Sequence, residues 1–109
     1  MCSGAKAAIN ISFYYSGLWL PVGGTSAAAP IWAAGTDIVN QALAAKGKPT
    51  FGGPQTVYSL ANGNNASKVY FDITRNTSAK YTFQATKGWD YVTGWGTPAF
   101  DQIFAALSQ

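Results

Sequence analysis

One serine stands where an attacking hydroxyl could be placed. Ser26 follows Gly23, Gly24 and Thr25 and opens an alanine-rich segment that predicts a helix. The two glycines allow a sharp turn and let a substrate approach the backbone closely. A serine at a helix start lies among unpaired N–H groups, at the positive end of the dipole, where an oxyanion can be stabilised. The alternative is that Ser26 or Thr25 only caps the helix, as serine and threonine often do.

The charged residues exclude several other kinds of chemistry. The 109 residues contain seven Lys and Arg and four acids, all of them Asp, with no His, for a net charge of +3. No Ser-His-Asp or Cys-His catalytic set and no His-ligated metal site can therefore be completed within this sequence. The basic residues stand singly, so nucleic acid and anionic membranes are poor candidates as partners. The single Cys2 excludes an internal disulfide framework.

The low content of charge points to extensive burial. Only 10% of the residues are charged, against about 25% in an average soluble domain. We therefore expect a chain that buries much of its surface, in a core or against a partner. The first residues carry no evident export signal, and no stretch approaches the roughly 18 apolar residues of a membrane span.

Two local patterns are expected to position Ser26. Ile11–Tyr15 and Leu18–Val22 are rich in β-branched and aromatic side chains, and Ser16-Gly17 between them is typical of a turn. We therefore predict a short hairpin that leads into the two glycines. The segment Ser26–Lys46 has the alanine content of a helix and apolar side chains on most faces, which predicts a buried helix.

The rest of the sequence predicts shorter elements. A short helix, a strand and a closing helix are expected at Thr56–Ala61, Val69–Ile73 and Phe100–Leu107, respectively. Between the strand and the closing helix, Thr86–Pro98 contains three glycines, two tryptophans and a proline. This composition indicates an ordered but irregular loop.

The segment around Ser26 resembles a known clan of serine peptidases. Gly24-Thr25-Ser26-Ala27-Ala28-Ala29-Pro30 looks like the nucleophile segment of the subtilisin-like clan. Subtilisins typically carry Met after the serine and His after the proline, where this chain has Ala27 and Ile31. With the preceding Tyr15-Ser16-Gly17-Leu18-Trp19, this version resembles instead the sedolisins, the acid-acting serine-carboxyl peptidases of family S53.

A second motif resembles the C-terminal calcium site of the same family. It consists of Phe71-Asp72-Ile73-Thr74 and of the segment from Gly88 to Pro98, which contains Asp90. The resemblance implies one Ca²⁺, and its ligands are the side chains of Asp72 and Asp90 and the carbonyl groups of Ile73, Thr86 and Gly88. Calcium takes about six to eight oxygen ligands from carboxylates, carbonyls and water, so this donor set suits it.

The chain departs from the family pattern at this calcium motif. Family members usually have Gly-Pro-Gly where this chain has Thr86-Lys87-Gly88, and Tyr91 replaces a usual proline. A carbonyl ligand does not depend on the type of side chain, but Lys87 places a positive charge close to the expected cation. The alternative for Asp72 and Asp90 is that each caps a turn, as aspartates often do.

The resemblance covers residues 11–109 and leaves residues 1–10 unassigned. It implies an α/β fold, namely the C-terminal part of a subtilisin-like parallel sheet with flanking helices. In sedolisins a catalytic Glu, a catalytic Asp and an oxyanion-hole Asp precede the nucleophile, whereas this chain has no Glu and no Asp before Ser26. The sequence therefore resembles the C-terminal portion of a sedolisin catalytic domain, and we expect it to be inactive alone.

The resemblance implies peptide hydrolysis at acidic pH, by an endopeptidase or a tripeptidyl-peptidase. Ser26 attacks a peptide or protein substrate, and a Glu from the missing N-terminal part of the catalytic domain takes its proton. A carboxylate base suits acid because its ordinary pKa is about 4.3. The family also implies an extracellular location. The alternative is a non-catalytic, calcium-stabilised binding module or pseudoenzyme remnant; a subtilisin remnant fits less well, because the flanking residues and the calcium motif differ.

Overall fold

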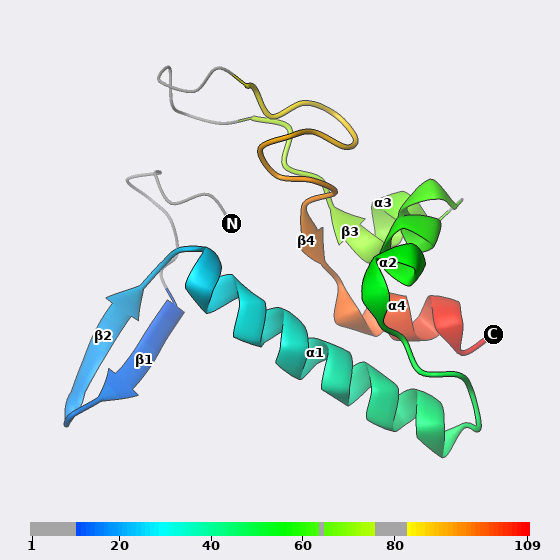
Figure 1. The fold of residues 1–109 in the computed structure, drawn as a ribbon, viewed down its shortest axis with the longest axis horizontal. Coiled ribbons are helices and arrows are strands. Elements are labelled where there is room, and N and C mark those ends of the chain that lie inside the picture. Colours follow the sequence, from blue (N-terminus) through cyan, green and yellow to red (C-terminus); the bar gives the residue numbers. More distant parts are fainter. Residues whose placement is uncertain (1–10, 64, 76–82) are drawn as a thin grey trace.

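The computed structural model describes residues 11–63, 65–75 and 83–109, which Figure 1 shows as a ribbon. The described elements, in chain order, are β1 Ile11–Tyr15, β2 Leu18–Val22, α1 Thr25–Ala45, α2 Gly53–Asn62, α3 Ala66–Val69, β3 Tyr70–Phe71, β4 Thr97–Pro98 and α4 Phe100–Leu107. Within these ranges, no helix is both long and apolar enough to cross a membrane.

The predicted hairpin is confirmed with its predicted bounds. β1 and β2 pair antiparallel along their whole length. Ser16 and Gly17 form the turn between them, with φ angles of 49° and 84°, as the two central residues of a type I′ turn require. Figure 1 shows the hairpin projecting from the start of α1, away from α2, α3 and α4. Its aromatic side chains are therefore largely exposed.

The predicted long helix is confirmed, but its expected burial is wrong. Of the residues of α1, Gly35, Val39 and Leu43 are buried, whereas Ile38 is 68% exposed. The buried residues are spaced four apart and so form a single stripe along the helix. The remaining apolar faces of α1 are not covered by the described part of the chain.

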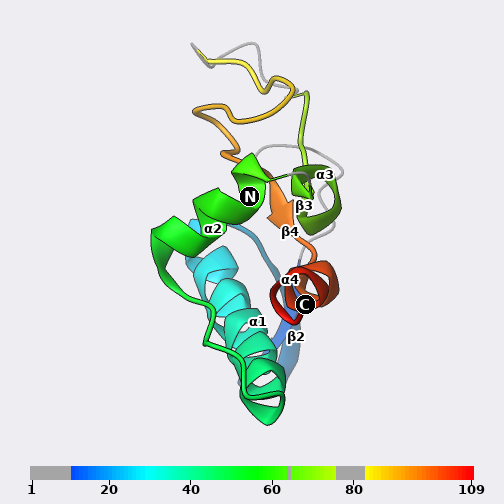
Figure 2. The same cartoon turned by 90° about the vertical axis from the view of Figure 1, so that its right-hand side faces the viewer.

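The core lies between the second half of α1 and the C-terminal elements. Its fully buried side chains come from α1, α3 and α4 and are Leu43, Val69 and Ile103. Figure 2 shows α4 lying alongside α1. Gly35 permits this approach, because a Cβ there would run into the ring of Phe100. That ring meets Trp32 edge-on, with ring centroids 5.7 Å apart, so Trp32 packs against the core.

The loop after α1 is attached to the helix by a side chain that the sequence did not single out. The Asn40 amide donates a hydrogen bond to the Phe51 carbonyl at 2.8 Å and accepts one from the Phe51 N–H at 2.6 Å. Phe51 is thereby held in the core with 3% of its surface exposed. The Tyr70 hydroxyl donates to the Val57 carbonyl at 2.9 Å, and burial raises the pKa of Tyr70 to about 12.

The expectations for the strands are only partly met. The helices predicted at Thr56–Ala61 and Phe100–Leu107 are confirmed as α2 and α4. The strand predicted at Val69–Ile73 is reduced to Tyr70–Phe71, because Val69 ends α3. β3 pairs antiparallel with β4. Both two-stranded sheets of the described part are thus antiparallel, so the parallel sheet implied by the resemblance is not seen there.

The molecule is more open than a compact domain of its length. Its Cα radius of gyration is 15.7 Å, against roughly 13 Å for a compact domain of about 100 residues. The described part accordingly exposes many large apolar side chains, and six of them lie in the hairpin: Phe13, Tyr14, Tyr15, Leu18, Trp19 and Leu20.

Candidate active site

Ser26 lies in the first turn of α1, in a segment that we call the serine turn (residues 23–28). Gly24 precedes the helix with a φ of 121°, in the region that favours glycine. Its carbonyl accepts the N–H groups of Ala27 at 3.1 Å and Ala28 at 3.2 Å. The N-cap residue is Gly24, and no side chain of the described residues makes a capping hydrogen bond here, so the interpretation of Ser26 or Thr25 as a cap is wrong.

Pro30 leaves the serine turn with fewer hydrogen bonds than the rest of the helix. In an α-helix, each carbonyl accepts the N–H of the residue four positions later. The residue four positions after Ser26 is Pro30, which lies inside α1 and has no N–H. The Ser26 carbonyl therefore has no helical partner, and the turn around the hydroxyl is less constrained than the turns that follow.

A hollow of about 350 Å³ lies beside Ser26, between the hairpin and the start of α1. Besides Ser26 it is lined by apolar residues only, namely Ile11, Phe13, Val22, Ala27, Pro30 and Ile31. Ser26 itself is exposed. The hydroxyl is therefore accessible to a substrate at the edge of an apolar wall, close to the positive end of the α1 dipole.

No acid–base partner for Ser26 comes from the described part of the chain. Asp37 and Asp101 are exposed, on α1 and α4. Asp72 and Asp90 are held by backbone N–H groups in a different loop. The start of α1 has the unpaired N–H groups that can stabilise an oxyanion, but no carboxylate of the described residues is bonded to Ser26.

The residues expected to bind calcium are brought together in one hydrogen-bonded segment, which we call the carboxylate loop (residues 72–73 and 86–96). Thr93 connects its parts. The Thr93 hydroxyl lies 3.1 Å and 3.0 Å from the two oxygens of Asp90 and 3.5 Å from the Ile73 carbonyl oxygen, so these three acceptors share its single proton. No sequence motif pointed to Thr93, although a threonine three residues after an aspartate is well placed to reach its side chain.

Asp90 is buried and its carboxylate is surrounded by donors. It accepts the N–H groups of Thr86 at 3.0 Å, Val92 at 2.8 Å and Thr93 at 2.7 Å. Burial raises the pKa of Asp90, but the hydrogen bonds from the Thr93, Thr86 and Val92 backbone and from the Thr93 hydroxyl together hold it below its ordinary value. These are the contacts of a turn-capping aspartate, and in this arrangement both oxygens are already used.

Asp72 is placed differently, because one of its oxygens has no partner among the described residues. Its Oδ2 accepts the Gly88 N–H at 2.7 Å, whereas Oδ1 is buried and receives no hydrogen bond from residues 11–63, 65–75 or 83–109. Asp72 also lines a hollow of about 200 Å³ together with Lys87 and Trp95. A buried carboxylate oxygen without a partner is costly, so a donor or a cation at this position is favoured.

A cation at the carboxylate loop would need backbone oxygens besides these carboxylates. The described residues contain no group of three or more His, Cys, Asp or Glu side chains able to hold a metal. Asp72 and Asp90 with carbonyl groups form an all-oxygen donor set, which fits a hard cation such as Ca²⁺ rather than a metal that prefers nitrogen or sulfur. The unpaired Asp72 Oδ1 is the observation that supports this fit.

Gly96 shapes the carboxylate loop in a way that the sequence did not reveal. It has a φ of 92°, and a Cβ there would collide with the carbonyl group of Phe71. Only glycine therefore fits where β3 meets the end of the loop. The contact joins segments that are distant in sequence, so no local pattern could have predicted it.

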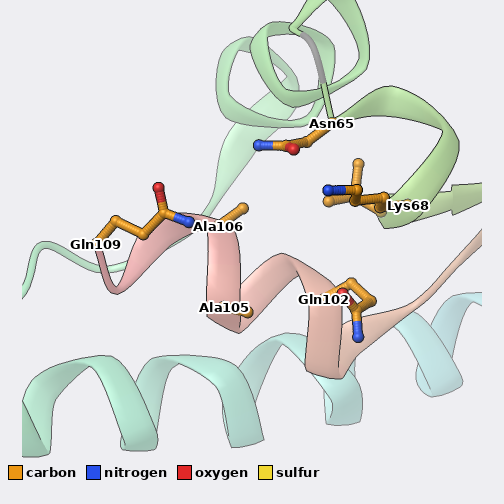
Figure 3. A pocket seen from close by; sticks show the side chains of 7 residues that line it. Asn65, Lys68, Gln102, Ala105, Ala106 and Gln109 are labelled. Carbon is orange, nitrogen blue, oxygen red and sulfur yellow. The ribbon is translucent and has the colours of Figure 1, made fainter.

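A third hollow, of about 100 Å³, lies between α3 and α4 (Figure 3). The polar side chains that line it are those of Asn65, Lys68, Gln102 and Gln109. Lys68 is the one ionisable side chain among its lining residues, and no acid or nucleophile faces it. This hollow therefore has no acid–base pair and none of the predicted site residues.

Comparison with known proteins finds peptidases. The tripeptidyl-peptidase SED2 of Arthroderma otae is 34% identical over 111 residues, which cover 90% of this chain. The tripeptidyl-peptidase sed1 of Aspergillus fumigatus is 36% identical over 102 residues and 91% of this chain. Physarolisin of Physarum polycephalum is 33% identical over 108 residues and 88% of this chain. No family model matches the chain.

The similarity is broad within this chain but covers a small share of each relative. The chain spans 19% of the length of the Arthroderma protein, 15% of the Aspergillus protein and 18% of physarolisin. Because about nine tenths of this chain is matched, the similarity is not confined to a single motif. The chain therefore belongs to the sedolisin family of peptidases and corresponds to the C-terminal portion of their catalytic domain.

Proposed function

We propose that this chain is the nucleophile-bearing segment of an acid-acting serine-type peptidase, an endopeptidase or a tripeptidyl-peptidase that cleaves peptides or proteins outside the cell. One observation carries the proposal: the exposed Ser26 hydroxyl lies in the first turn of α1, without a capping bond, beside an apolar hollow. Membership of the sedolisin family and relatives named as tripeptidyl-peptidases support it.

The proposed reaction begins when Ser26 Oγ attacks the scissile carbonyl. The proton of the hydroxyl passes to a Glu carboxylate, which the preceding part of the catalytic domain supplies and a second carboxylate orients. The Ser26 N–H and the positive end of α1 stabilise the oxyanion. In this complete domain, the hairpin and α1 join a subtilisin-like parallel sheet, whose other strands are not in this chain.

The carboxylate loop is proposed to hold one Ca²⁺ through the side chains of Asp72 and Asp90 and the carbonyl groups of Ile73, Thr86 and Gly88. When bound, the ion supplies positive charge that neutralises two carboxylates. Support comes from Asp72 Oδ1, which is buried and has no hydrogen-bond partner in the described part of the chain. Ligation by Asp90 requires the Thr93 hydroxyl to release one of its oxygens, because this hydroxyl now contacts both.

The calcium proposal is tested by thermal unfolding of the chain with Ca²⁺ and with a chelator. A ligand that binds only the folded state raises the melting temperature with its concentration. We expect such a rise for the unmodified chain and for Asp101→Asn, whose side chain is exposed on α4. Asp72→Asn should abolish it. Identical melting curves with Ca²⁺ and with chelator would refute the site.

The second candidate is a non-catalytic binding module or pseudoenzyme remnant that keeps the scaffold. The observation in its favour is that no carboxylate of the described chain is bonded to Ser26. A chimera distinguishes the two candidate functions. In it, this chain replaces the matching segment of the Aspergillus fumigatus peptidase. The chimera supplies the part of the domain in which the family carries its catalytic acids.

Peptide hydrolysis by this chimera is measured at about pH 4, near the ordinary pKa of a carboxylate base. We expect activity that falls by at least about a thousandfold in Ser26→Ala, because the nucleophile is lost. Ser12→Ala is the matched control, since Ser12 is an exposed serine of the hairpin. A folded chimera that is inactive, or equally active with Ser26→Ala, would favour the non-catalytic candidate.

A further inference from the structure

The hollow beside Asp72 is lined by two residues with buried polar atoms that have no hydrogen-bond partner in the described part of the chain. The atoms are Asp72 Oδ1 and Trp95 Nε1, and the hollow measures about 200 Å³. An indole N–H only donates a hydrogen bond, whereas an ionised carboxylate only accepts one. Of the two atoms, Asp72 Oδ1 is therefore the one that a cation can satisfy, and leaving it unpaired is costly.

Lys87 is held beside this acceptor by its two neighbours in sequence. The Thr86 N–H donates to Asp90 Oδ2 at 3.0 Å. The Gly88 N–H donates to Asp72 Oδ2 at 2.7 Å. The backbone of Lys87 is thus fixed between the two carboxylates of the loop. Its side chain lines the same hollow as Asp72 and is exposed to solvent.

The ammonium of Lys87 can reach Asp72 by movement of its own side chain. Within residues 11–63, 65–75 and 83–109, this ammonium forms no hydrogen bond or ion pair. Lysine carries its charge on a flexible four-carbon stem, and exposed side chains change rotamer within nanoseconds. An ion pair with Asp72 Oδ1 therefore needs no change of the loop backbone. Arg75 is also exposed and follows Asp72 by three residues, but it does not line the hollow.

We infer that the Lys87 ammonium is the counter-ion of Asp72 in the chain without calcium, and that Ca²⁺ competes with it for Asp72 Oδ1. The second half of the inference rests on the proposed calcium site. Binding of the ion displaces Lys87, and the two positive charges repel each other at short range. The loop therefore binds Ca²⁺ more weakly than it would with an uncharged side chain at position 87. In return, Asp72 is not left as an unpaired charge when calcium is scarce.

A double-mutant cycle in the presence of a chelator tests the ion pair without calcium. Urea unfolding of the full chain is measured for the unmodified chain, for Lys87→Gln, for Asp72→Asn and for the double variant. In the unmodified chain, Lys87→Gln should lower the folding equilibrium constant about two- to fivefold, the usual effect of a partly screened ion pair. In the Asp72→Asn background it should lower this constant less than about 1.5-fold, because the partner charge is gone.

Calorimetric titration with CaCl₂ tests the competition. In about 20 mM KCl, Lys87→Gln should bind Ca²⁺ about threefold or more tightly than the unmodified chain does. This gain should shrink in about 1 M KCl, where the Debye length is roughly 3 Å. Lys68→Gln is the matched control, because Lys68 is also exposed but lines the hollow between α3 and α4 (Figure 3). It should change the dissociation constant for Ca²⁺ less than about 1.5-fold.

Each measurement has a result that would overturn the inference. Equal effects of Lys87→Gln with and without Asp72→Asn would show that the two side chains do not pair, and coupling of Asp72 to Arg75→Gln instead would assign the counter-ion to Arg75. Equal dissociation constants for Lys87→Gln and the unmodified chain would refute the competition, whereas Ca²⁺ binding by Lys87→Gln alone would support it. If neither binds Ca²⁺ but the cycle shows coupling, the calcium site and the competition fail and the ion pair stands.

Discussion

The carboxylate loop and the serine turn differ in how much of their surroundings this chain supplies. Asp90 is 6% exposed and receives hydrogen bonds from three backbone N–H groups and one hydroxyl, all from its own loop. Ser26 is exposed, makes no capping bond and borders an apolar hollow. The chain thus supplies hydrogen-bond partners for the carboxylate of Asp90, whereas the side chain of Ser26 makes no capping bond and stays exposed.

The difference follows from the position of the core along α1. The buried stripe of this helix includes Gly35, Val39 and Leu43, whereas Ser26 and Pro30 lie at its other, exposed end. The same helix therefore takes part in the core at one end and exposes Ser26 at the other. A helix anchored only at its far end can hold Ser26 in position without covering it.

The largest effect is expected from removing core volume at the anchored end of α1. Leu43→Ala should lower the free energy of unfolding by about 2–5 kcal/mol, the usual cost of a large cavity in a packed core. Ile31→Ala, on the exposed end of the same helix, should lower it by less than about 1 kcal/mol. Urea unfolding of the full chain measures both. Equal losses would mean that the serine end is packed as tightly as the core.

The next largest effect is expected at the end of the carboxylate loop. Gly96→Ala should cost at least about 2 kcal/mol, because the new Cβ meets the Phe71 carbonyl and the φ is unfavourable for alanine. Gly94→Ala is the control. It has a similar positive φ but free space around a Cβ, so about 1 kcal/mol is expected. Equal losses of unfolding free energy at the two positions would show that a Cβ at position 96 does not clash with the Phe71 carbonyl.

Local patterns were sufficient to predict the elements around Ser26. The hairpin was predicted because its turn residues and alternating apolar side chains are neighbours in sequence. The burial of α1 was mispredicted for a physical reason. Alanine and apolar residues occupy most faces of this helix, so the sequence does not distinguish the face that is buried from the faces that are exposed. The buried stripe is selected by α4, through Gly35 and Phe100, which are far apart in the chain.

The position of the carboxylate loop could be predicted from Asp72 and Asp90, but the hydrogen bonds within the loop could not. Thr93 joins the Ile73 carbonyl to Asp90, and the side chain of Asn40 holds the backbone of Phe51. Such side-chain bonds depend on segments that meet only after folding. The strand at Val69–Ile73 was overestimated for the same reason, because the partner strand β4 is short and permits only two pairs.

A smaller effect is expected from removing one hydroxyl of the carboxylate loop. Thr93→Val keeps the size of the side chain but loses the bonds to Asp90 and to the Ile73 carbonyl, which should cost about 1–2 kcal/mol. Thr97→Val is the control, because the Thr97 hydroxyl makes no hydrogen bond in the part of the chain that the structure describes; about 0.5 kcal/mol or less is expected. If Thr93→Val costs no more than this control, the hydroxyl does not hold the loop together.

The smallest effect is expected on the dependence of the unfolding free energy on pH in acid. Because the pKa of folded Asp90 lies below the ordinary value of about 3.9, its carboxylate contributes stability that is complete above that pH. This contribution is lost as the pH falls through the lower, folded-state pKa. Asp90→Asn should therefore weaken the dependence of the unfolding free energy on pH below about 4. Urea unfolding at a series of acidic pH values measures the slope.

Asp101→Asn distinguishes a buried carboxylate from an exposed one. A hydrogen bond from Gln102 lowers the pKa of Asp101 too, but Asp101 is exposed and solvent screens the interaction. Its replacement should change the slope less than Asp90→Asn does. If both variants change the slope equally, the hydrogen-bond donors around Asp90 do not lower its pKa. A larger change for Asp90→Asn would show that the hydrogen-bond donors of the loop keep its carboxylate ionised in acid.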